Sequence, residues 1–462
     1  MYHLGHQSLW LDEIGQVITA SSSWHDLFRI VGTHLSPPLD YILLKFFLVF
    51  GKADWIVRLP AAIYGILSIP VFYLLARYFI GKTQAWVPTM YFTLSPMAIA
   101  YSQEARMYSL FLLLSLVSLY LTVRWCEEQS WPWAIGLGAV NGLLLLTHYF
   151  GMFVMVIEGL YWLWRYKNVK ITSWKIPQAV VNAGISLLIF SPWVPLLLNQ
   201  FRHAEHTPGY GMPFLPLFFS VLLSQYSSIG FFNGWYYGFA LLFLLGTIMA
   251  IIHKNHKLVV LASAFVIMLV SLFLITSHAQ IVTTRNTIFL LPIYLLVVGY
   301  GTSILLELIP GPKWLKNVMV VGILLFPVYQ YHLQPSQYSK QDYKTVANYL
   351  REHMEESSKV LVVDLIERGC LAYYLEPSSD HVYVRSGYFD QRNRDGDSVW
   401  VLNDVVKTRA RQDLLKAWLV LTNAQDKTFR TIPGIVSTCV LEVGSGDKAL
   451  MVYSLAAESA DK

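Results

Sequence analysis

Long apolar stretches recur along the first 332 residues of this 462-residue chain, and they restrict its fold more than any other feature. A helix that crosses a bilayer needs about 20 mostly apolar residues. Ten segments meet or approach this length: 56–76, 84–101, 107–123, 133–150, 151–164, 177–198, 236–252, 258–277, 287–308 and 315–332. Only 14% of the residues are charged, against roughly a quarter in soluble domains. The sequence therefore predicts a polytopic α-helical membrane protein and excludes a disordered chain, a nucleic-acid-binding module and a plain cytosolic enzyme.

The charged residues concentrate at the C-terminal end, where 34 of the 63 lie in the last 130 positions. The pattern there predicts a helix over 342–356 and strands at 359–364, 399–402, 418–422, 435–442 and 451–455. This alternation is typical of a Rossmann-like layered sheet, but no G-x-G-x-x-G follows the first strand, so no nucleotide site is predicted. Cys370 and Cys439 could pair there, or stay as free buried thiols.

We therefore expect three parts: an external loop with interfacial helices (1–54), a transmembrane helical domain (55–332) and a small external soluble α/β domain (333–462). Residues 37–50 are apolar but too short to span, and Asp40 and Lys45 interrupt them, which favours a helix at the interface. The polar start of the chain has no signal peptide or helix before it. An external N-terminus of this kind is hard to insert, so we expect a first spanning helix to be missing.

The basic residues of the loops predict the orientation, because Lys and Arg accumulate on the cytoplasmic side. Alternate loops carry eleven of them: Arg77, Lys82, Arg124, Arg165, Lys167, Lys170, Lys175, Lys254, Lys257, Lys313 and Lys316. The opposite loops carry three, Arg106, Arg202 and Arg285. The first set is expected to be cytoplasmic, so that the C-terminal domain is external or periplasmic on an inner or plasma membrane.

This topology gathers the unusual polar residues on the outer rim, which favours a reaction at the outer face. Glu158 is an exception, since it lies near the middle of a predicted span; a transporter would place more charges there. The first candidate is the pair Asp12 and Glu13, which could supply a general base or a metal ligand. The alternative is an ordinary helix N-terminus, where carboxylates favour the positive end of the dipole.

A second candidate is the short turn from Gln103 to Tyr108. Glu104 and Arg106 could merely pair or snorkel at the surface. Arg106, however, begins the next helix, where the dipole disfavours a cation, so an anionic partner is expected. Phosphate fits, because the guanidinium fork binds it in a bidentate manner.

The remaining candidates are single residues, each with a structural alternative. Arg58 and Arg285 could anchor the protein at the interface, and His148 could be a structural hydrogen-bonding group at a helix end. His203, Glu205 and His206 could bind a metal, but their Pro/Gly-rich loop favours solvated polar residues.

The order of these motifs resembles a known family. The run from Tyr2 to Glu13, Ser-Pro-Pro-Leu at 36–39, Arg58-Leu-Pro, the run from Tyr101 to Tyr108 and Thr-His-Tyr at 147–149 are similar to glycosyltransferase family 39 of the GT-C superfamily. Its members include dolichyl-phosphate-mannose protein mannosyltransferases and lipid A aminoarabinose transferases. The resemblance is strongest over 2–165. Ser36, where many relatives have His, and Asp40, where an aromatic residue is frequent, depart from the pattern.

The resemblance implies transfer of a sugar from a polyprenyl-phosphate donor to an acceptor at the outer face, usually with inversion. The acceptor would be a protein, a lipid or a polysaccharide. The family's acidic pair falls on Asp12 and Glu13, with Asp12 as the general base. The donor-phosphate candidates are Arg285, Arg106 and Arg58, and further site candidates are Glu104, Gln103, Tyr108, His34 and His148. No cofactor is certain, and a divalent metal stays open.

Two other functions fit the composition. A transporter or flippase of lipid-linked sugars would share the lipid groove without bond chemistry. A non-catalytic scaffold would use the external tail to recruit partners of the cell envelope.

Overall fold

The structure of the protein is a computed structural model. It describes residues 4–33, 36–168, 175–204, 217–227, 235–278, 282–312, 341–354, 360–362, 365–375, 399–401, 418–422, 435–443 and 450–457, with six single positions between 314 and 325. The chain divides into two compact units. The first consists of Met1–Asp26, Phe47–Val57 and Ser336–Lys462, and the second of Leu27–Phe46 and Arg58–Pro335. Each unit is described separately, and the domain limits expected from the sequence stay a prediction.

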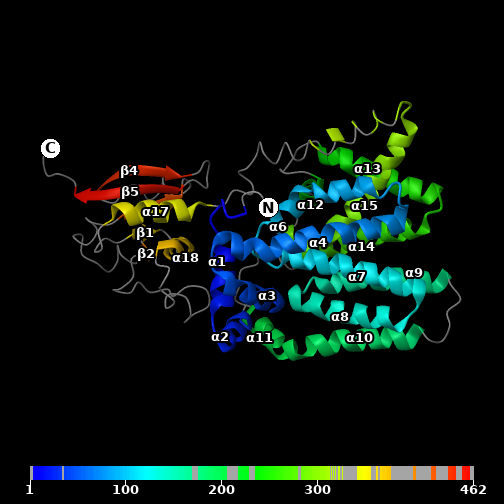
Figure 1. Cartoon of the computed structure of the whole chain (residues 1–462), viewed down its shortest axis with the longest axis horizontal. Helices are drawn as coiled ribbons and strands as arrows, with labels where there is room; N and C mark the ends of the chain where they lie inside the picture. Colours follow the sequence, from blue (N-terminus) through cyan, green and yellow to red (C-terminus); the bar gives the residue numbers. More distant parts are fainter. Residues whose placement is uncertain are drawn as a thin grey trace. The chain divides into compact units, whose positions relative to one another are not determined.

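Helices make up the second unit and the segments that lead into it (Figure 1). They are α2 (Trp24–Val31), α3 (Leu39–Phe47), η1 (Leu48–Phe50), α4 (Asp54–Ile80), α5 (Trp86–Thr93), α6 (Pro96–Ser102), α7 (Tyr108–Glu128), α8 (Trp131–Thr147), α9 (Gly151–Asn168), α10 (Lys175–Phe190), η2 (Ser191–Trp193), α11 (Val194–Ala204), α12 (Leu217–Ser227), α13 (Trp235–Ile252), α14 (His256–His278), η3 (Arg285–Leu290) and α15 (Leu291–Leu308). Within the described ranges, five helical stretches are long and apolar enough to cross a membrane. The predicted polytopic helical fold is confirmed.

Two predicted spans contain breaks in the structure, and a third is largely untested. Residues 84–101 form two helices instead of one, because Ser95 caps α6 through a hydrogen bond from the Ala98 N–H at 3.4 Å and Pro96 occupies the first helical position. Residues 177–198 run through α10, η2 and α11, with a 3₁₀ turn at Ser191–Trp193 where Pro192 lies. Most of the predicted span 315–332 lies outside the described residues.

Small residues let the helices of the second unit approach one another closely. A Cβ placed on Gly301 of α15 would lie 2.1 Å from the Leu242 carbonyl oxygen of α13. A Cβ on Gly246 of α13 would lie 2.3 Å from the Val297 carbonyl oxygen of α15. Glycines at such contacts are typical of helix packing in membranes, where apolar surface alone gives no preference for protein over lipid. The α15 region is the most enclosed of the five stretches, with 94% of its apolar window buried.

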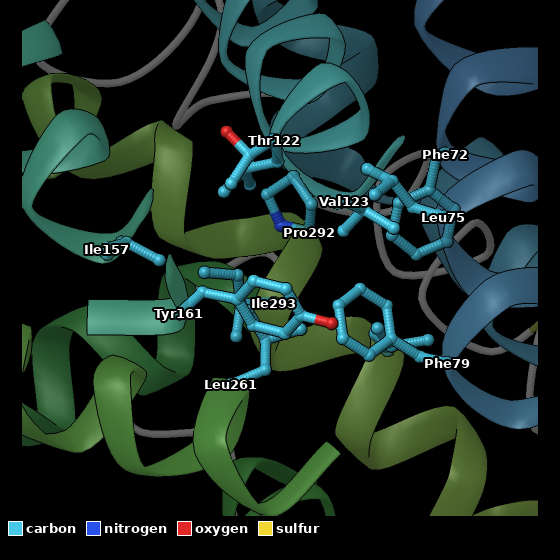
Figure 2. A pocket seen from close by; sticks show the side chains of 12 residues that line it. Phe72, Leu75, Phe79, Thr122, Val123, Ile157, Tyr161, Leu261, Pro292 and Ile293 are labelled. Carbon is cyan, nitrogen blue, oxygen red and sulfur yellow. The ribbon is translucent and has the colours of Figure 1, made fainter. Parts of the chain in front are cut away.

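A small apolar pocket with a cavity volume of about 20 Å³ lies between the helices (Figure 2). Its lining comes from α4, α7, α9, α14 and α15, with Phe72 and Phe79 on one side and Ile157 and Tyr161 on the other. Pro292 and Ile293 of α15 line it as well. The pocket is therefore part of the same core that encloses α15.

A network of charged and aromatic groups closes one end of the helices. The Tyr78 hydroxyl donates to Glu127 Oε1 at 2.5 Å, and Lys257 Nζ donates to the same oxygen at 3.2 Å. Lys257 Nζ also lies 4.0 Å from the centre of the Tyr78 ring, and an Arg165 nitrogen is 3.7 Å from Glu127. Arg165 and Lys257 are among the residues predicted to be cytoplasmic. The structure brings them to the same end of the bundle, and the assignment of that end to the cytoplasm stays a prediction.

The first unit contains a five-stranded sheet in the order β2-β1-β3-β5-β4. β1 (Val360–Val362) pairs in parallel with β2 (Val399–Val401) and β3 (Trp418–Thr422). β4 (Ile435–Val443) and β5 (Leu450–Ala457) form an antiparallel pair, and β5 continues antiparallel to β3. All five predicted strands are present, but the sheet is mixed because only six residues join β4 and β5, too few for a parallel crossover. α17 (Tyr343–His353) and α18 (Leu365–Leu375) pack on this sheet, and Cys370 and Cys439 are free thiols.

A matched pair of substitutions tests the glycine contact. Gly301→Ala forces α13 and α15 apart, because the added methyl group would overlap a backbone carbonyl, and we expect a loss of about 1–3 kcal/mol of stability. Gly184→Ala in α10 adds a methyl group where no atom lies within 4 Å, so it should leave stability unchanged or raise it slightly. Thermal unfolding in detergent measures both. Equal behaviour of the two variants would contradict the close packing of α15.

Candidate functional site

Basic and aromatic side chains meet at one end of the second unit. Tyr108 begins α7, His148 follows the last residue of α8, and Arg285 begins η3. The Arg285 guanidinium carbon lies 5.8 Å from the centre of the Tyr108 ring. The His148 ring centre is 6.1 Å from that of Tyr108, and His148 lies within electrostatic range of Arg106 and Arg285. We call Arg106, Tyr108, His148, Arg285 and Asn286 the arginine cluster.

His148 is held in a defined orientation inside this cluster. Its ring stacks on Phe111 with centres 4.8 Å apart, and its side chain is hydrogen-bonded to Asn286. Its Nδ1 accepts a hydrogen bond from the Phe150 N–H at 3.1 Å, so the ring proton lies on Nε2 and the imidazole is neutral. A neutral imidazole adds no repulsion between the two guanidinium groups. His148 is therefore a structural hydrogen-bonding group at a helix end, and it also lies beside the two arginines.

Arg58 and Arg106 are buried, with 2% and 9% of their surfaces exposed. The start of α4 is fixed to the start of α7, since the Ser109 hydroxyl donates to the Ala61 carbonyl oxygen at 2.7 Å. Arg58 lies three residues before Ala61, on the same face of α4. Burying guanidinium groups is costly unless anionic or polar groups compensate them, and both arginines take part in further interactions within the protein.

The other predicted residues of the second unit lie around this end. Gln103 caps the C-terminus of α6 and donates its N–H to the Ala100 carbonyl at 3.1 Å, and the Glu104 carbonyl accepts from the Arg106 N–H at 2.8 Å. Asp40 of α3 is buried and lies within electrostatic range of Tyr64 on α4. His34, Glu205 and His206 lie outside the described residues.

The acidic pair belongs to the first unit, on α1 (Leu11–Ser21). Glu13 is fully buried, and its Oε2 accepts a hydrogen bond from the Trp10 N–H at 3.3 Å. This contact is one half of a capping box. Glu13 therefore caps the N-terminus of the helix, which is the alternative that the sequence analysis gave for the acidic pair. Asp12, at the second position of the helix, is half-buried.

Four residues around the acidic pair have no local sequence signal. Lys344 Nζ donates to Asp54 Oδ2 at 2.9 Å, and the Tyr374 hydroxyl donates to Asp54 Oδ1 at 3.3 Å. Burial and the carboxylates of Asp54 and Glu13 raise the pKa of the neighbouring Tyr373 hydroxyl, so Tyr373 stays protonated. Phe111 of the second unit was also missed. No group of three metal-ligating side chains occurs in the part of the chain that the structure describes.

Comparison with known proteins gives a family and a fold. Residues 35–195 match the family model of dolichyl-phosphate-mannose-protein mannosyltransferases. Among solved structures, the chain is similar to ArnT from Cupriavidus metallidurans in its apo state, with a TM-score of 0.58 and 14% identity over 97% of this chain and 94% of ArnT. The same ArnT bound to undecaprenyl phosphate gives a TM-score of 0.57 over the same shares of the two chains and 14% identity. No curated protein sequence matches the chain.

The chain is therefore a polytopic helical membrane protein with an ArnT-like fold. Its resemblance to the dolichyl-phosphate-mannose-protein mannosyltransferases, predicted from the order of its motifs, is confirmed over residues 35–195.

The capping role of Glu13 predicts different outcomes for two substitutions. Glu13→Gln keeps an acceptor for the Trp10 N–H and should leave the melting temperature nearly unchanged. Glu13→Ala removes the acceptor in a buried position, so we expect a loss of about 1 kcal/mol or more. Thermal unfolding with Asp12→Asn as the control measures the difference. A stability loss in Glu13→Gln as large as in Glu13→Ala would exclude the capping role.

Proposed function

We propose that the protein transfers a sugar from a polyprenyl-phosphate-linked donor to an acceptor hydroxyl at the outer face of the membrane. The observation that carries this proposal is the arginine cluster, where Arg106, Arg285 and the neutral His148 converge at one end of a GT-C-type helical unit. The match to a family named for dolichyl-phosphate-mannose substrates supports the lipid-phosphate donor. A structural neighbour at 14% identity that binds undecaprenyl phosphate is consistent with it.

The arginines bind the donor phosphate in this proposal. A guanidinium presents a planar fork of N–H donors that matches phosphate oxygens. When the bond between the sugar and the phosphate breaks, the phosphate gains negative charge, and preorganised cations lower the energy of that state most in a partly dehydrated site. Arg58 and Arg106 are buried as this role requires, and Arg285 lies over Tyr108.

Asp12 is the general base in this proposal. The acceptor oxygen attacks the anomeric carbon as the bond to the phosphate oxygen breaks; the bonding electrons leave with the phosphate, and the acceptor proton passes to Asp12. A single displacement of this kind inverts the anomeric centre. An ordinary aspartate is a weak base, so its contribution depends on position and comes late in the transition state. Glu13 is occupied at the helix N-terminus, which favours Asp12 for this role.

The first test of this proposal removes the base. Purified protein is incubated with radiolabelled polyprenyl-phosphate sugars and a membrane extract that supplies acceptors, and the label is followed from the lipid into a new product. We expect Asp12→Asn to lower transfer at least a hundredfold while the protein stays folded. A near wild-type rate in Asp12→Asn would exclude Asp12 as the base.

The second test removes a phosphate contact. Arg285→Ala should weaken donor binding about 10- to 100-fold, because a hydrogen bond to a charged group contributes about 1.5–3 kcal/mol. Arg124→Ala is the matched control, since Arg124 pairs with Glu128 at the C-terminal end of α7. Binding of polyprenyl phosphate is measured for both variants. Unchanged binding in Arg285→Ala would remove this residue from the phosphate site.

A further inference from the structure

The segment just before α1 is tied to the C-terminal part of the first unit by a chain of hydrogen bonds. The Leu9 N–H donates to the Tyr374 hydroxyl oxygen at 2.5 Å. The Tyr374 hydroxyl donates to Asp54 Oδ1 at 3.3 Å, and Asp54 Oδ2 accepts from Lys344 Nζ at 2.9 Å. The connected groups come from parts of the chain that lie up to 365 positions apart. All of them belong to the same compact unit.

The hydrogen bonds among Leu9, Tyr374, Asp54 and Lys344 have compatible donors and acceptors. A tyrosine hydroxyl has one proton to donate and lone pairs that accept. Tyr374 accepts from the Leu9 N–H and gives its proton to the Asp54 carboxylate, whose charge the Lys344 ammonium balances. Leu9 is fully buried and Asp54 is 6% exposed, so water does not easily replace these partners. Such hydrogen bonds are worth most where the local dielectric is low.

Other contacts fix the same segment from both sides. The Ser8 hydroxyl donates to the Gln341 carbonyl oxygen at 2.6 Å, and the Tyr343 hydroxyl donates to Gln341 Oε1 at 2.8 Å. On the other side, a Cβ on Gly5 would lie 3.2 Å from Trp55 Cβ. The residues that precede α1 are therefore held between the start of α4 and the beginning of the C-terminal domain.

Asp12 depends on this attachment for its direction. α1 begins at Leu11, two residues after the anchored Leu9 N–H, and Asp12 is its second residue. The anchored backbone before a helix sets where its first turn points. α1 also packs against α18, the helix that carries Tyr374. A shift of about 1 Å at a catalytic group can lower a rate about a hundredfold.

We propose that Tyr374, held by Asp54 and Lys344, is a positioning residue for Asp12, so that the C-terminal α/β domain takes part in sugar transfer by orienting the base. This inference rests on the proposed function, in which Asp12 accepts the proton of the acceptor hydroxyl. The residue touches neither the donor phosphate nor the reacting atoms and acts through α1.

The test compares Tyr374→Phe with Tyr453→Phe. Tyr453 lies in β5 of the same sheet domain, and its hydroxyl contacts Met451 Sδ at 3.7 Å, so its substitution removes a tyrosine hydroxyl that is outside the hydrogen bonds among Leu9, Tyr374, Asp54 and Lys344. We expect Tyr374→Phe to lower kcat at least tenfold while the donor KM changes less than twofold. Tyr453→Phe should retain wild-type values. Since Tyr374 acts through Asp12, Tyr374→Phe combined with Asp12→Asn should be no slower than Asp12→Asn alone.

A second readout does not depend on activity. Hydrogen exchange of the backbone amides over residues 9–21 should be at least tenfold faster in Tyr374→Phe than in Tyr453→Phe. Should Tyr374→Phe fail to fold, Lys344→Met carries the same test, because the half-exposed Lys344 loses only its contact with Asp54. Unchanged exchange and unchanged kcat would overturn the inference while leaving the proposed function intact. Absence of transfer by the wild-type protein with every donor would instead overturn the proposed function.

Discussion

The enclosure of α15 by its neighbours is the constraint on which the second unit depends. In a bilayer, lipid chains are as apolar as leucine side chains, so helices associate through close packing and hydrogen bonds. Gly246 and Gly301 provide that packing between α13 and α15, and Gly299 adds a contact with Pro88 of α5. η3 runs directly into α15 and packs against α7. The position of Arg285 beside Tyr108 is therefore a consequence of how α15 is packed.

The two ends of the helical unit differ in their chemistry. At one end, Glu127 compensates Lys257 and Arg165 and joins four helices. At the other end, arginines gather around a neutral histidine and aromatic rings. Between the ends, Glu158 is hydrogen-bonded to Ser118, and Asn141 Nδ2 donates to its Oε2 at 2.8 Å, so this polar group is satisfied within α7, α8 and α9. Among the described residues, this arrangement supports transfer chemistry at one end better than passage through the membrane.

Much of this architecture could be predicted from the sequence because it follows from local patterns. The apolar stretches predicted the positions of most spanning helices. The β runs of the C-terminal region predicted all five strands of the sheet. The sequence also contains a signal for the break at Ser95–Pro96, since a capping serine before a proline starts a new helix. The high overall hydropathy of residues 84–101 led instead to the prediction of one span. The connections among Leu9, Tyr374, Asp54 and Lys344 could not be predicted, because they join distant segments and depend on tertiary packing. The capping role of Glu13 was one of two readings, and only the Trp10 contact decides between them.

Cleavage of the bond between a sugar and a polyprenyl phosphate distinguishes the proposed transferase from a transporter. The most direct measurement uses purified protein in lipid vesicles, with a labelled polyprenyl-phosphate sugar in one leaflet and acceptor extract outside. Free polyprenyl phosphate and labelled product are quantified together, and the leaflet that holds the remaining donor is determined. We expect one polyprenyl phosphate to be released for each sugar transferred. Intact donor that appears in the opposite leaflet without bond cleavage would contradict it and identify a transporter instead.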